Sequence, residues 1–172
     1  MWYVMQVKTG NEENICTQCR KIISEELLER CFVPYFEEKR KLRGQWHILK
    51  KVMFPGYVFV ITGEPIELRS ELRNIIGFSK LLAICDEIIP LSEKEVSFLS
   101  RIGLDEKQVL EMSEGIIEGD KVIVTEGSLI GMEGFIKKID RHKRKAWLEI
   151  EMFGRMQRIE MGLEIVEKKG MK

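Results

Sequence analysis

The sequence predicts an α+β protein with an antiparallel sheet in its N-terminal part and a small β-barrel in its C-terminal part. Apolar residues before position 104 alternate between strand and helix periods in the order β-α-β-β-β-α-β-α, which is typical of antiparallel α+β folds. After residue 117 the pattern changes to five short strands separated by turn residues, which suits a small barrel. We therefore expect two domains, at 1–103 and 117–169, joined by an acidic linker at 104–116.

Local signals predict the first elements of the N-terminal domain. Residues 2–8, WYVMQVK, are rich in aromatic and β-branched side chains and predict a strand buried on both faces. Asn11 suits a helix N-cap, and an apolar stripe that includes Cys19 continues at helical spacing for about four turns. Residues 31–39 predict a strand, in which Pro34 indicates an edge or a bulge.

The later elements follow from turn residues and caps. We expect a long hairpin that turns at 42–45, then a strand at 56–62 and a helix at 64–75. A strand at 78–84 precedes a last helix, for which Ser92 and Glu95 form a capping box and Gly103 supplies the stop.

Composition favours a folded protein, and a separate search for motifs indicates no enzyme. Charged residues make up 33% of the chain, with 28 basic and 28 acidic side chains, so the net charge is zero. No apolar run reaches the roughly 18 residues of a membrane span, and no signal peptide is visible, so we expect a cytoplasmic protein without a membrane partner. The chain has no recognisable catalytic motif, and we expect neither activity nor cofactor.

The cysteines raise the question of a metal or redox site. Cys16 and Cys19 have C-x-x-C spacing, which can indicate either zinc or a redox pair. A structural zinc site needs four ligands, and the chain has no second C-x-x-C. Both histidines, His47 and His142, lie inside basic runs. We therefore expect reduced cysteines, some of them packing residues, and no metal.

The segment 54–60, FPGYVFV, places aromatic rings on one strand. After Pro55-Gly56, Tyr57 and Phe59 alternate with aliphatic residues, so the rings share one face. The rings are either core residues or, if helices cover only the other face of the sheet, a surface for a partner. The alternation alone does not decide between the two.

Two basic runs are the other notable feature. The first lies on the hairpin with Trp46 and His47 interleaved; it suits phosphate contact, or a solvated hairpin tip that prevents edge pairing. The second lies at a turn before Trp147 and is denser than a solubilising turn needs, which favours nucleic-acid contact. The cations of the hairpin are Lys39, Arg40, Lys41, Arg43, Lys50 and Lys51. The residues of the turn are Lys137, Lys138, Arg141, His142, Lys143, Arg144 and Lys145.

Several stretches resemble the NusG family of transcription factors. WYVMQVKTGNEENI, MFPGYVFV, LRNIIGF and PLSEKEV are similar to its N-terminal NGN domain. EGDKVIVTEGSLIGMEGFIKKID and IEMFGRMQRIEMGLEIVEK are similar to its C-terminal KOW domain. The resemblance covers nearly the whole chain in the family order. It implies a ferredoxin-like NGN domain followed by an SH3-like barrel.

The resemblance also implies partners. Family members bind the clamp helices of RNA polymerase through a hydrophobic depression, and Phe54, Tyr57 and Phe59 match positions of that surface. Phe153 matches an exposed aromatic that contacts transcription and translation partners. The stretch 36–59 is closer to specialised LoaP and RfaH-type paralogues, which implies a processive antitermination factor whose basic KOW turn binds a nascent RNA hairpin. Non-template DNA is a further implied contact.

Two other interpretations stay open at this point. The chain is alternatively a housekeeping NusG-type elongation and termination factor without specific RNA recognition. A third interpretation is a KOW-containing RNA-binding module of ribosome assembly, although such modules do not need a complete N-terminal domain. Ile76, where family members often have Pro, and the Cys16–Cys19 pair depart from the family pattern.

Overall fold

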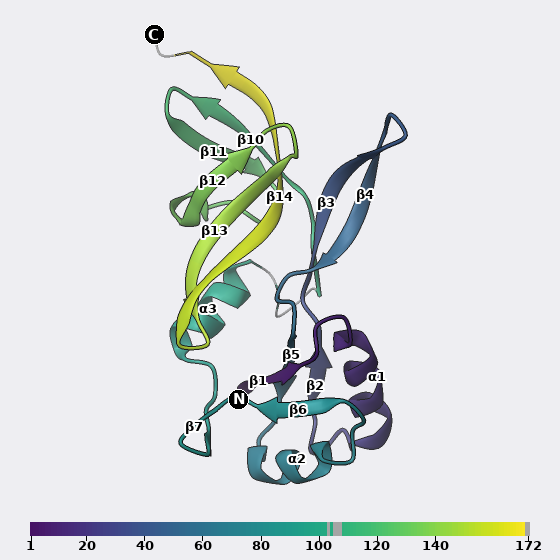
Figure 1. The fold of residues 1–172 in the computed structure, drawn as a ribbon. Coiled ribbons are helices and arrows are strands. Elements are labelled where there is room, and N and C mark those ends of the chain that lie inside the picture. Colours follow the sequence, from purple (N-terminus) through teal and green to yellow (C-terminus); the bar gives the residue numbers. More distant parts are fainter. Residues whose placement is uncertain (103, 105–107, 171–172) are drawn as a thin grey trace. The chain divides into compact units, whose positions relative to one another are not determined.

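The computed structural model describes residues 1–102, 104 and 108–170 (Figure 1). The chain divides into two compact units. The N-terminal unit contains residues 1–34 and 54–98, and the C-terminal unit contains the described residues of 35–53 and 99–172. The hairpin between 35 and 53 thus belongs with the C-terminal unit although it interrupts the N-terminal one in sequence.

The N-terminal unit is built on an antiparallel sheet of strand order β2-β5-β1-β6. Helices and strands together give the α+β class, which confirms the predicted fold class. Its elements are β1 (Trp2–Val7), α1 (Glu12–Ile22), β2 (Arg30–Phe32), β5 (Tyr57–Ile61), α2 (Pro65–Leu72), β6 (Phe78–Leu81), β7 (Ala83–Ile84) and β8 (Glu87–Ile88). Helix α3 (Glu93–Arg101) begins in this unit.

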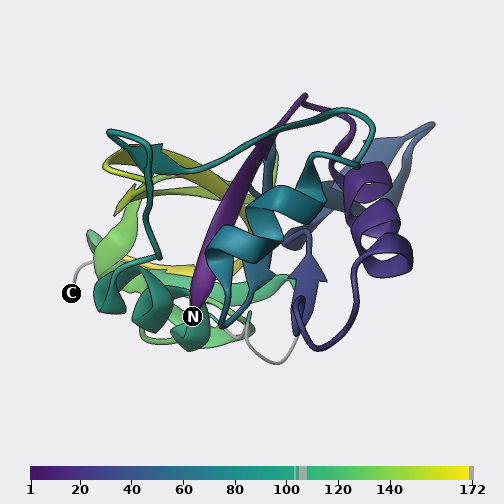
Figure 2. The same cartoon turned by 90° about the horizontal axis from the view of Figure 1, so that it is seen from below.

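The core of the N-terminal unit lies between the sheet and helices α1 and α2, which run along the sheet in Figures 1 and 2. Met5 pairs with Val58, and both are completely buried. Ile15 of α1 and Leu68 of α2 are also completely buried. The aliphatic face of β5 is therefore core, as the alternation predicts.

Glu12 joins the start of α1 to the turn before β5. Its side chain is buried, and its carboxylate accepts hydrogen bonds from the backbone N–H of Gly10 at 2.8 Å and of Gly56 at 2.7 Å. Gly56 has φ +85°, and a Cβ there would lie 3.2 Å from Oγ1 of Thr9. The positive φ favours glycine at this residue, which precedes the aromatic strand, and a Cβ would also press on Thr9.

The C-terminal unit contains a five-stranded sheet of order β11-β10-β14-β13-β12 and a three-stranded sheet of order β4-β3-β9. The β3–β4 hairpin turns at Arg43-Gly44, both with positive φ, as a two-residue loop of type I′ requires. The elements are β3 (Tyr35–Leu42), β4 (Gln45–Val52), β9 (Val109–Leu110), β10 (Ser113–Glu118), β11 (Lys121–Glu126), the 3-10 helix η1 (Glu133–Phe135), β12 (Ile136–Asp140), β13 (Lys145–Met152) and β14 (Arg155–Lys169).

Several local predictions are confirmed. The hairpin turns where expected, and Pro65 opens α2. The capping box of α3 forms in both directions: the backbone N–H of Ser92 donates to Oε2 of Glu95 at 2.7 Å, and the backbone N–H of Glu95 donates to Oγ of Ser92 at 3.3 Å. The predicted stop at Gly103 lies outside the described residues.

Other local predictions are wrong. Helix α1 has 11 residues, or three turns rather than four, because the backbone turns extended at Ile23. The strand expected at 31–39 is two strands, since the chain breaks at Val33-Pro34. The two strands expected within 155–168 are one strand, β14, and β10 begins at Ser113, inside the expected linker.

The units and the predicted domains do not share boundaries. The hairpin lies inside the predicted 1–103 domain but groups with the C-terminal unit. Residues 105–107 of the predicted linker lie outside the described residues. The domain boundaries themselves stay a prediction.

Candidate nucleic-acid and protein interfaces

The turn between β12 and β13 carries the denser of the two basic runs. Asp140 shapes this turn, since its Oδ1 accepts the backbone N–H of Lys143 at 2.9 Å. The same hydrogen bond lowers the pKa of the Asp140 carboxyl, because it stabilises the charged form. Arg141, His142 and Lys143 are left exposed at the tip.

Arg144 is held differently from its neighbours. Its Nη1 lies 3.0 Å from Oε1 of Glu164 in β14, and its guanidinium lies over the ring of Trp46 with Cζ 3.7 Å from the centroid. Glu164 also forms an ion pair with Lys39 of β3. The carboxylate of Glu164 therefore joins a cation of the turn to a cation of the hairpin.

Lys145 forms the second link between the turn and the hairpin. Its ammonium pairs with Glu38 of β3 and lies 3.1 Å from Glu160 of β14. Glu38 is buried, with 2% of its side chain exposed, and it also pairs with Lys51 at 3.3 Å. Burial lowers the pKa of Lys145, but hydrogen bonds to Glu38 and Glu160 outweigh it, so the net shift of that pKa is upward.

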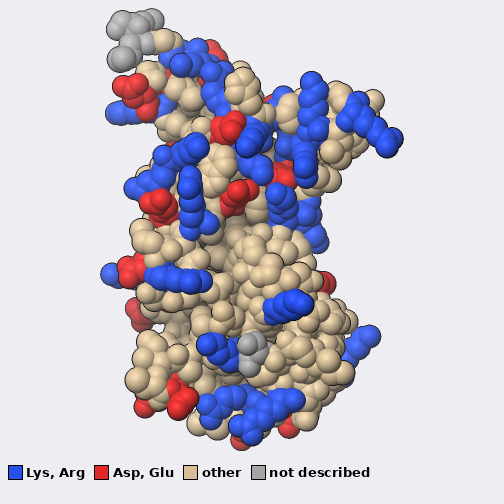
Figure 3. Space-filling view, viewed as in Figure 1, with Lys and Arg blue, Asp and Glu red and all other residues tan. Residues whose placement is uncertain are grey.

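The two basic runs, far apart in sequence, line one pocket. We call the cations of the two runs, with His142, the basic surface. The pocket has a volume of about 400 Å³ and an open, polar character. It is lined by Glu38, Lys39, Arg40, Lys41, Trp46, Lys51, His142, Lys143 and Lys145. Figure 3 shows Lys and Arg gathered over the C-terminal unit and its hairpin on the face drawn.

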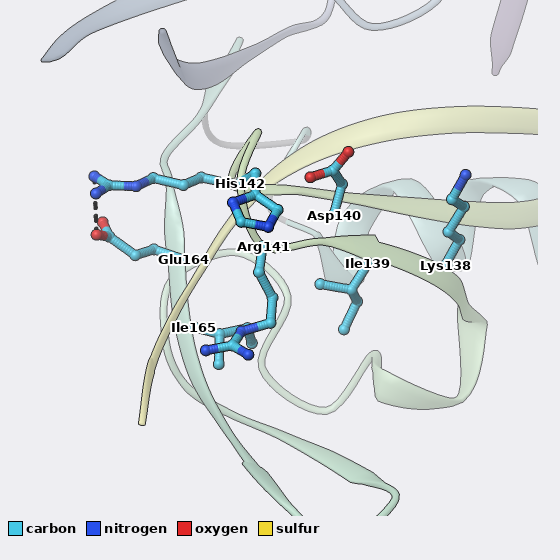
Figure 4. Close-up of a pocket in the computed structure, with 8 residues that line it drawn as sticks. Lys138, Ile139, Asp140, Arg141, His142, Glu164 and Ile165 are labelled. Carbon is cyan, nitrogen blue, oxygen red and sulfur yellow. Dashed lines mark ion pairs between the residues drawn. The ribbon is translucent and has the colours of Figure 1, made fainter. Parts of the chain in front are cut away.

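A second pocket borders the same turn and shares His142 with the first. It measures about 560 Å³ and is lined by Lys138, Ile139, Asp140, Arg141, His142, Arg144, Glu164 and Ile165. Figure 4 shows the ion pair of Glu164 in this pocket, with His142 and Arg141 nearby. Lys138 is exposed, and its ammonium lies 5.3 Å from the ring centroid of Trp147. Lys137 is exposed on the same strand.

The aromatic residues of the FPGYVFV segment are buried. Phe54, Tyr57 and Phe59 are 3%, 8% and 0% exposed, so the expectation of an uncovered aromatic face is wrong for these rings. The physical reason lies partly in the rings themselves. Phe59 stacks on Phe32 with centroids 5.6 Å apart and lies 5.5 Å from Phe54. Whether these residues bind polymerase stays a prediction.

Sequence reasoning missed two members of this aromatic face. Phe32 of β2 pairs with Phe59, and Trp2 of β1 meets Phe32 edge-on at 5.6 Å. Trp2 is half-buried, and so is Arg30, whose guanidinium lies 4.3 Å from the Phe32 centroid. The alternation in WYVMQV could have identified Trp2, since every second side chain of a strand lies on the same face and Trp2 lies on the face next to Phe59. We call Trp2, Phe32, Phe54, Tyr57 and Phe59 the aromatic face.

Phe153 occupies the two-residue turn between β13 and β14. It has φ +58° and is followed by Gly154 at φ +71°, so both turn residues are left-handed. The side chain is half-buried rather than exposed, which differs from the expectation. Its role in partner contact stays a prediction.

The cysteines form a buried group. Cys16, Cys19 and Cys31 are buried and free, and Cys85 is exposed and free. Hydrogen bonds from Cys31 to the other two thiols, together with burial, raise the pKa of the Cys31 thiol well above its usual range. Within the described residues, no group of three or more His, Cys, Asp or Glu is arranged to hold a metal ion. No helix in the described part of the chain is long and apolar enough to cross a membrane.

An α+β unit followed by a unit rich in strands that presents a dense basic surface defines a class of protein suited to contact with nucleic acid. Comparison with known proteins identifies the family. The family model described as transcription termination factor nusG matches residues 1–100, so the chain belongs to the NusG family.

Relatives match over almost the whole chain. A protein called transcription termination/antitermination protein NusG from Haemophilus influenzae is 27% identical over 97% of this chain and 93% of its own length. The protein of the same name from Bacillus subtilis is 27% identical over 97% of both chains. A structure titled "Domain interaction in Thermotoga maritima NusG" aligns with a TM-score of 0.58 at 23% identity, over 94% of this chain and 92% of the other. This structural likeness supports the fold.

Proposed function

We propose that this NusG-type transcription termination/antitermination factor acts as a processive antitermination factor in the cytoplasm. In this proposal the N-terminal unit binds the clamp helices of RNA polymerase, and the basic surface binds a hairpin in the nascent RNA. The observation that carries the RNA part is that two basic runs line one pocket of about 400 Å³. Phosphate groups are attracted to such clusters of Lys and Arg.

The exposed cations are the proposed first contacts for RNA. Arg141, His142 and Lys143 project from a turn that Asp140 shapes. On the hairpin, Arg40 and Lys41 are also exposed. Trp46, which is 40% exposed, supplies a ring of the kind on which unpaired bases stack. Non-template DNA is a second ligand of the same chemistry for the hairpin.

The RNA proposal is tested by titrating the protein with the leader RNA of its own operon at several salt concentrations. We expect the logarithm of the binding constant to fall with the logarithm of salt by roughly 0.7–0.9 for each phosphate contact. Arg141→Gln and Lys143→Gln should each reduce this slope by about one contact. Equal affinity for a scrambled RNA would remove the claim of specific recognition.

The polymerase proposal places the contact at the aromatic face of the N-terminal unit. Tyr57 is 8% exposed, so little of its side chain is accessible, and the half-buried Trp2 and Arg30 extend the surface. Arg, Trp and Tyr are the residue types that dominate protein interfaces. We expect Tyr57→Ala to cost about 2 kcal/mol of polymerase binding, measured by titrating labelled protein with core RNA polymerase.

A matched control separates binding from folding. Val58 is completely buried and lies on the opposite face of the same strand. Val58→Ala lowers stability without touching the aromatic face, so it should leave polymerase affinity unchanged wherever the unit is folded. A folded Tyr57→Ala protein with wild-type affinity would refute the assignment.

A housekeeping factor without RNA specificity is the second candidate function. It is favoured by the relatives called NusG, which match over 97% of the chain. Under this candidate the basic surface binds any RNA equally, and Phe153 carries contacts with transcription and translation factors. The scrambled-RNA comparison distinguishes the two.

A further inference from the structure

The carboxylate of Glu164 lies within the basic surface. It pairs with Arg144 at 3.0 Å and also with Lys39, and 19% of its side chain is exposed. By contrast, no ion pair involves Arg141, His142 or Lys143 within the described residues. The turn therefore presents Arg141, His142 and Lys143 without an ion pair among the described residues, which we call the open cations. Arg144, at the base of the turn, has its charge compensated by Glu164.

Arg144 is arranged to bind an anion at the edge of its guanidinium. The indole of Trp46 covers one face of its guanidinium, and the carboxylate of Glu164 approaches an edge nitrogen. A guanidinium binds carboxylate and phosphate through the same N–H groups. A phosphate that approaches Arg144 either displaces Glu164 or binds the remaining N–H groups beside it, where the carboxylate repels it.

We propose that Glu164 is a specificity-determining residue that suppresses the binding of unselected RNA by occupying Arg144. This inference rests on the proposed RNA-binding function. An RNA that makes enough contacts with the open cations displaces the carboxylate, whereas an RNA with few contacts does not. Glu164 thus makes tight binding depend on the number of contacts that an RNA forms with the open cations.

The test uses a pool of RNA stem–loops with randomised sequence and the full chain. Glu164→Gln keeps the size of the side chain but frees Arg144 and Lys39, so affinity for the pool should rise about tenfold. The matched control is Glu167→Gln on the same strand, which changes net charge equally. Glu167 is more than half exposed and its pair with Lys169 spans 4.0 Å, so affinity should rise about twofold or less.

A double-variant cycle shows whether the effect passes through Arg144. In an Arg144→Gln background, Glu164→Gln should raise affinity no more than Glu167→Gln does. Glu164→Asp keeps the charge and should leave affinity for the pool low. Urea unfolding of each variant checks that the fold is retained.

The outcomes separate this inference from the proposed function. If the wild type binds the pool and Glu164→Gln binds it no more tightly than Glu167→Gln, the role of Glu164 is overturned and RNA binding stands. A full effect of Glu164→Gln without Arg144 would overturn the role as well. If none of the variants binds RNA, both proposals are overturned.

Discussion

At the scale of single residues, buried carboxylates hold the parts of each unit in place. Glu12 is an example, because it accepts two backbone N–H groups from segments 46 residues apart, Gly10 and Gly56. Hydrogen bonds to a charged acceptor are stronger than neutral ones. Glu12 therefore fixes the turn that starts the aromatic strand.

We expect Glu12→Gln to lower the free energy of unfolding of the N-terminal unit by about 2 kcal/mol. Gly10 and Gly56 donate to different oxygens of Glu12, and Gln keeps only one acceptor oxygen, so one of the two buried N–H groups loses its partner. Urea denaturation measures this loss. Glu13→Gln is the control: Glu13 is exposed and its ion pair with Arg20 spans 3.9 Å, so the change should cost under about 0.5 kcal/mol. Equal losses in both variants would contradict the role of Glu12.

The Lys145 cluster gives a residue-scale prediction with a pH dependence. Among the described residues, Lys145→Met leaves the buried Glu38 with Lys51 as its one ion-pair partner. We expect a loss of about 2 kcal/mol at pH 7, since removing one partner of a buried carboxylate leaves its charge only partly compensated. Burial raises the pKa of Glu160, but its bonds with Lys145 and Trp147 outweigh this, so that pKa is lowered on balance.

The directions of the two pKa shifts, down for Glu160 and up for Lys145, determine the pH range in which these ion pairs stabilise the fold. A lowered carboxyl pKa contributes stability above the unfolded value of about 4.3, which is lost as pH falls through the folded value. The raised pKa of Lys145 contributes stability that is present below about 10.4 and lost as pH rises through the folded value. Urea denaturation of the wild type and Lys145→Met from pH 3 to 9 should show a difference that shrinks below about pH 4. A difference unchanged at pH 3 would contradict this explanation.

At the scale of elements, hairpin turns were predictable and long strands were not. Arg43-Gly44 lies between two strand patterns, and a turn at this point follows from local chemistry alone. Strand β14 runs through Gly162, where a Cβ would meet the backbone O of Glu37 at 2.3 Å. Its sequence suggested a break there, but the close approach of β3 requires glycine within a continuous strand.

Strand β10 escaped prediction because its pattern depends on its neighbours. SEGIIE is acidic and lacks clear alternation, yet it pairs with β11 on one side and β14 on the other. Gly115 lies there because a Cβ would meet the backbone O of Ile123 at 2.7 Å. Central position in a sheet overrides weak local preference.

The β13–β14 turn gives an element-scale prediction. Phe153 adopts φ +58°, which costs most residues other than Gly and Asn about 1 kcal/mol. Phe153→Asn should therefore keep the free energy of unfolding of the C-terminal unit within about 1 kcal/mol of wild type while removing the ring. Thermal unfolding checks this. A larger loss would show that the ring is part of the core rather than available to a partner.

At the scale of the whole molecule, zero net charge conceals the basic surface. The 28 basic and 28 acidic residues cancel in sum, yet two basic runs line one pocket. Each run was visible in the sequence, but their meeting was not, because it depends on Glu38 and Glu164, which resemble ordinary strand residues. The same reasoning failed for the aromatic face, since alternation assigns rings to a face without showing what covers it.

The most direct test of the account is the salt dependence of RNA binding by the wild type and by the double variant Arg141→Gln/Lys143→Gln. Both residues are exposed in the wild type, so the fold should be unaffected. With the leader RNA as ligand, the slope of log binding constant against log salt should fall by about 1.4, or roughly 0.7 for each lost phosphate contact. An unchanged slope and affinity would contradict the claim that this turn binds RNA.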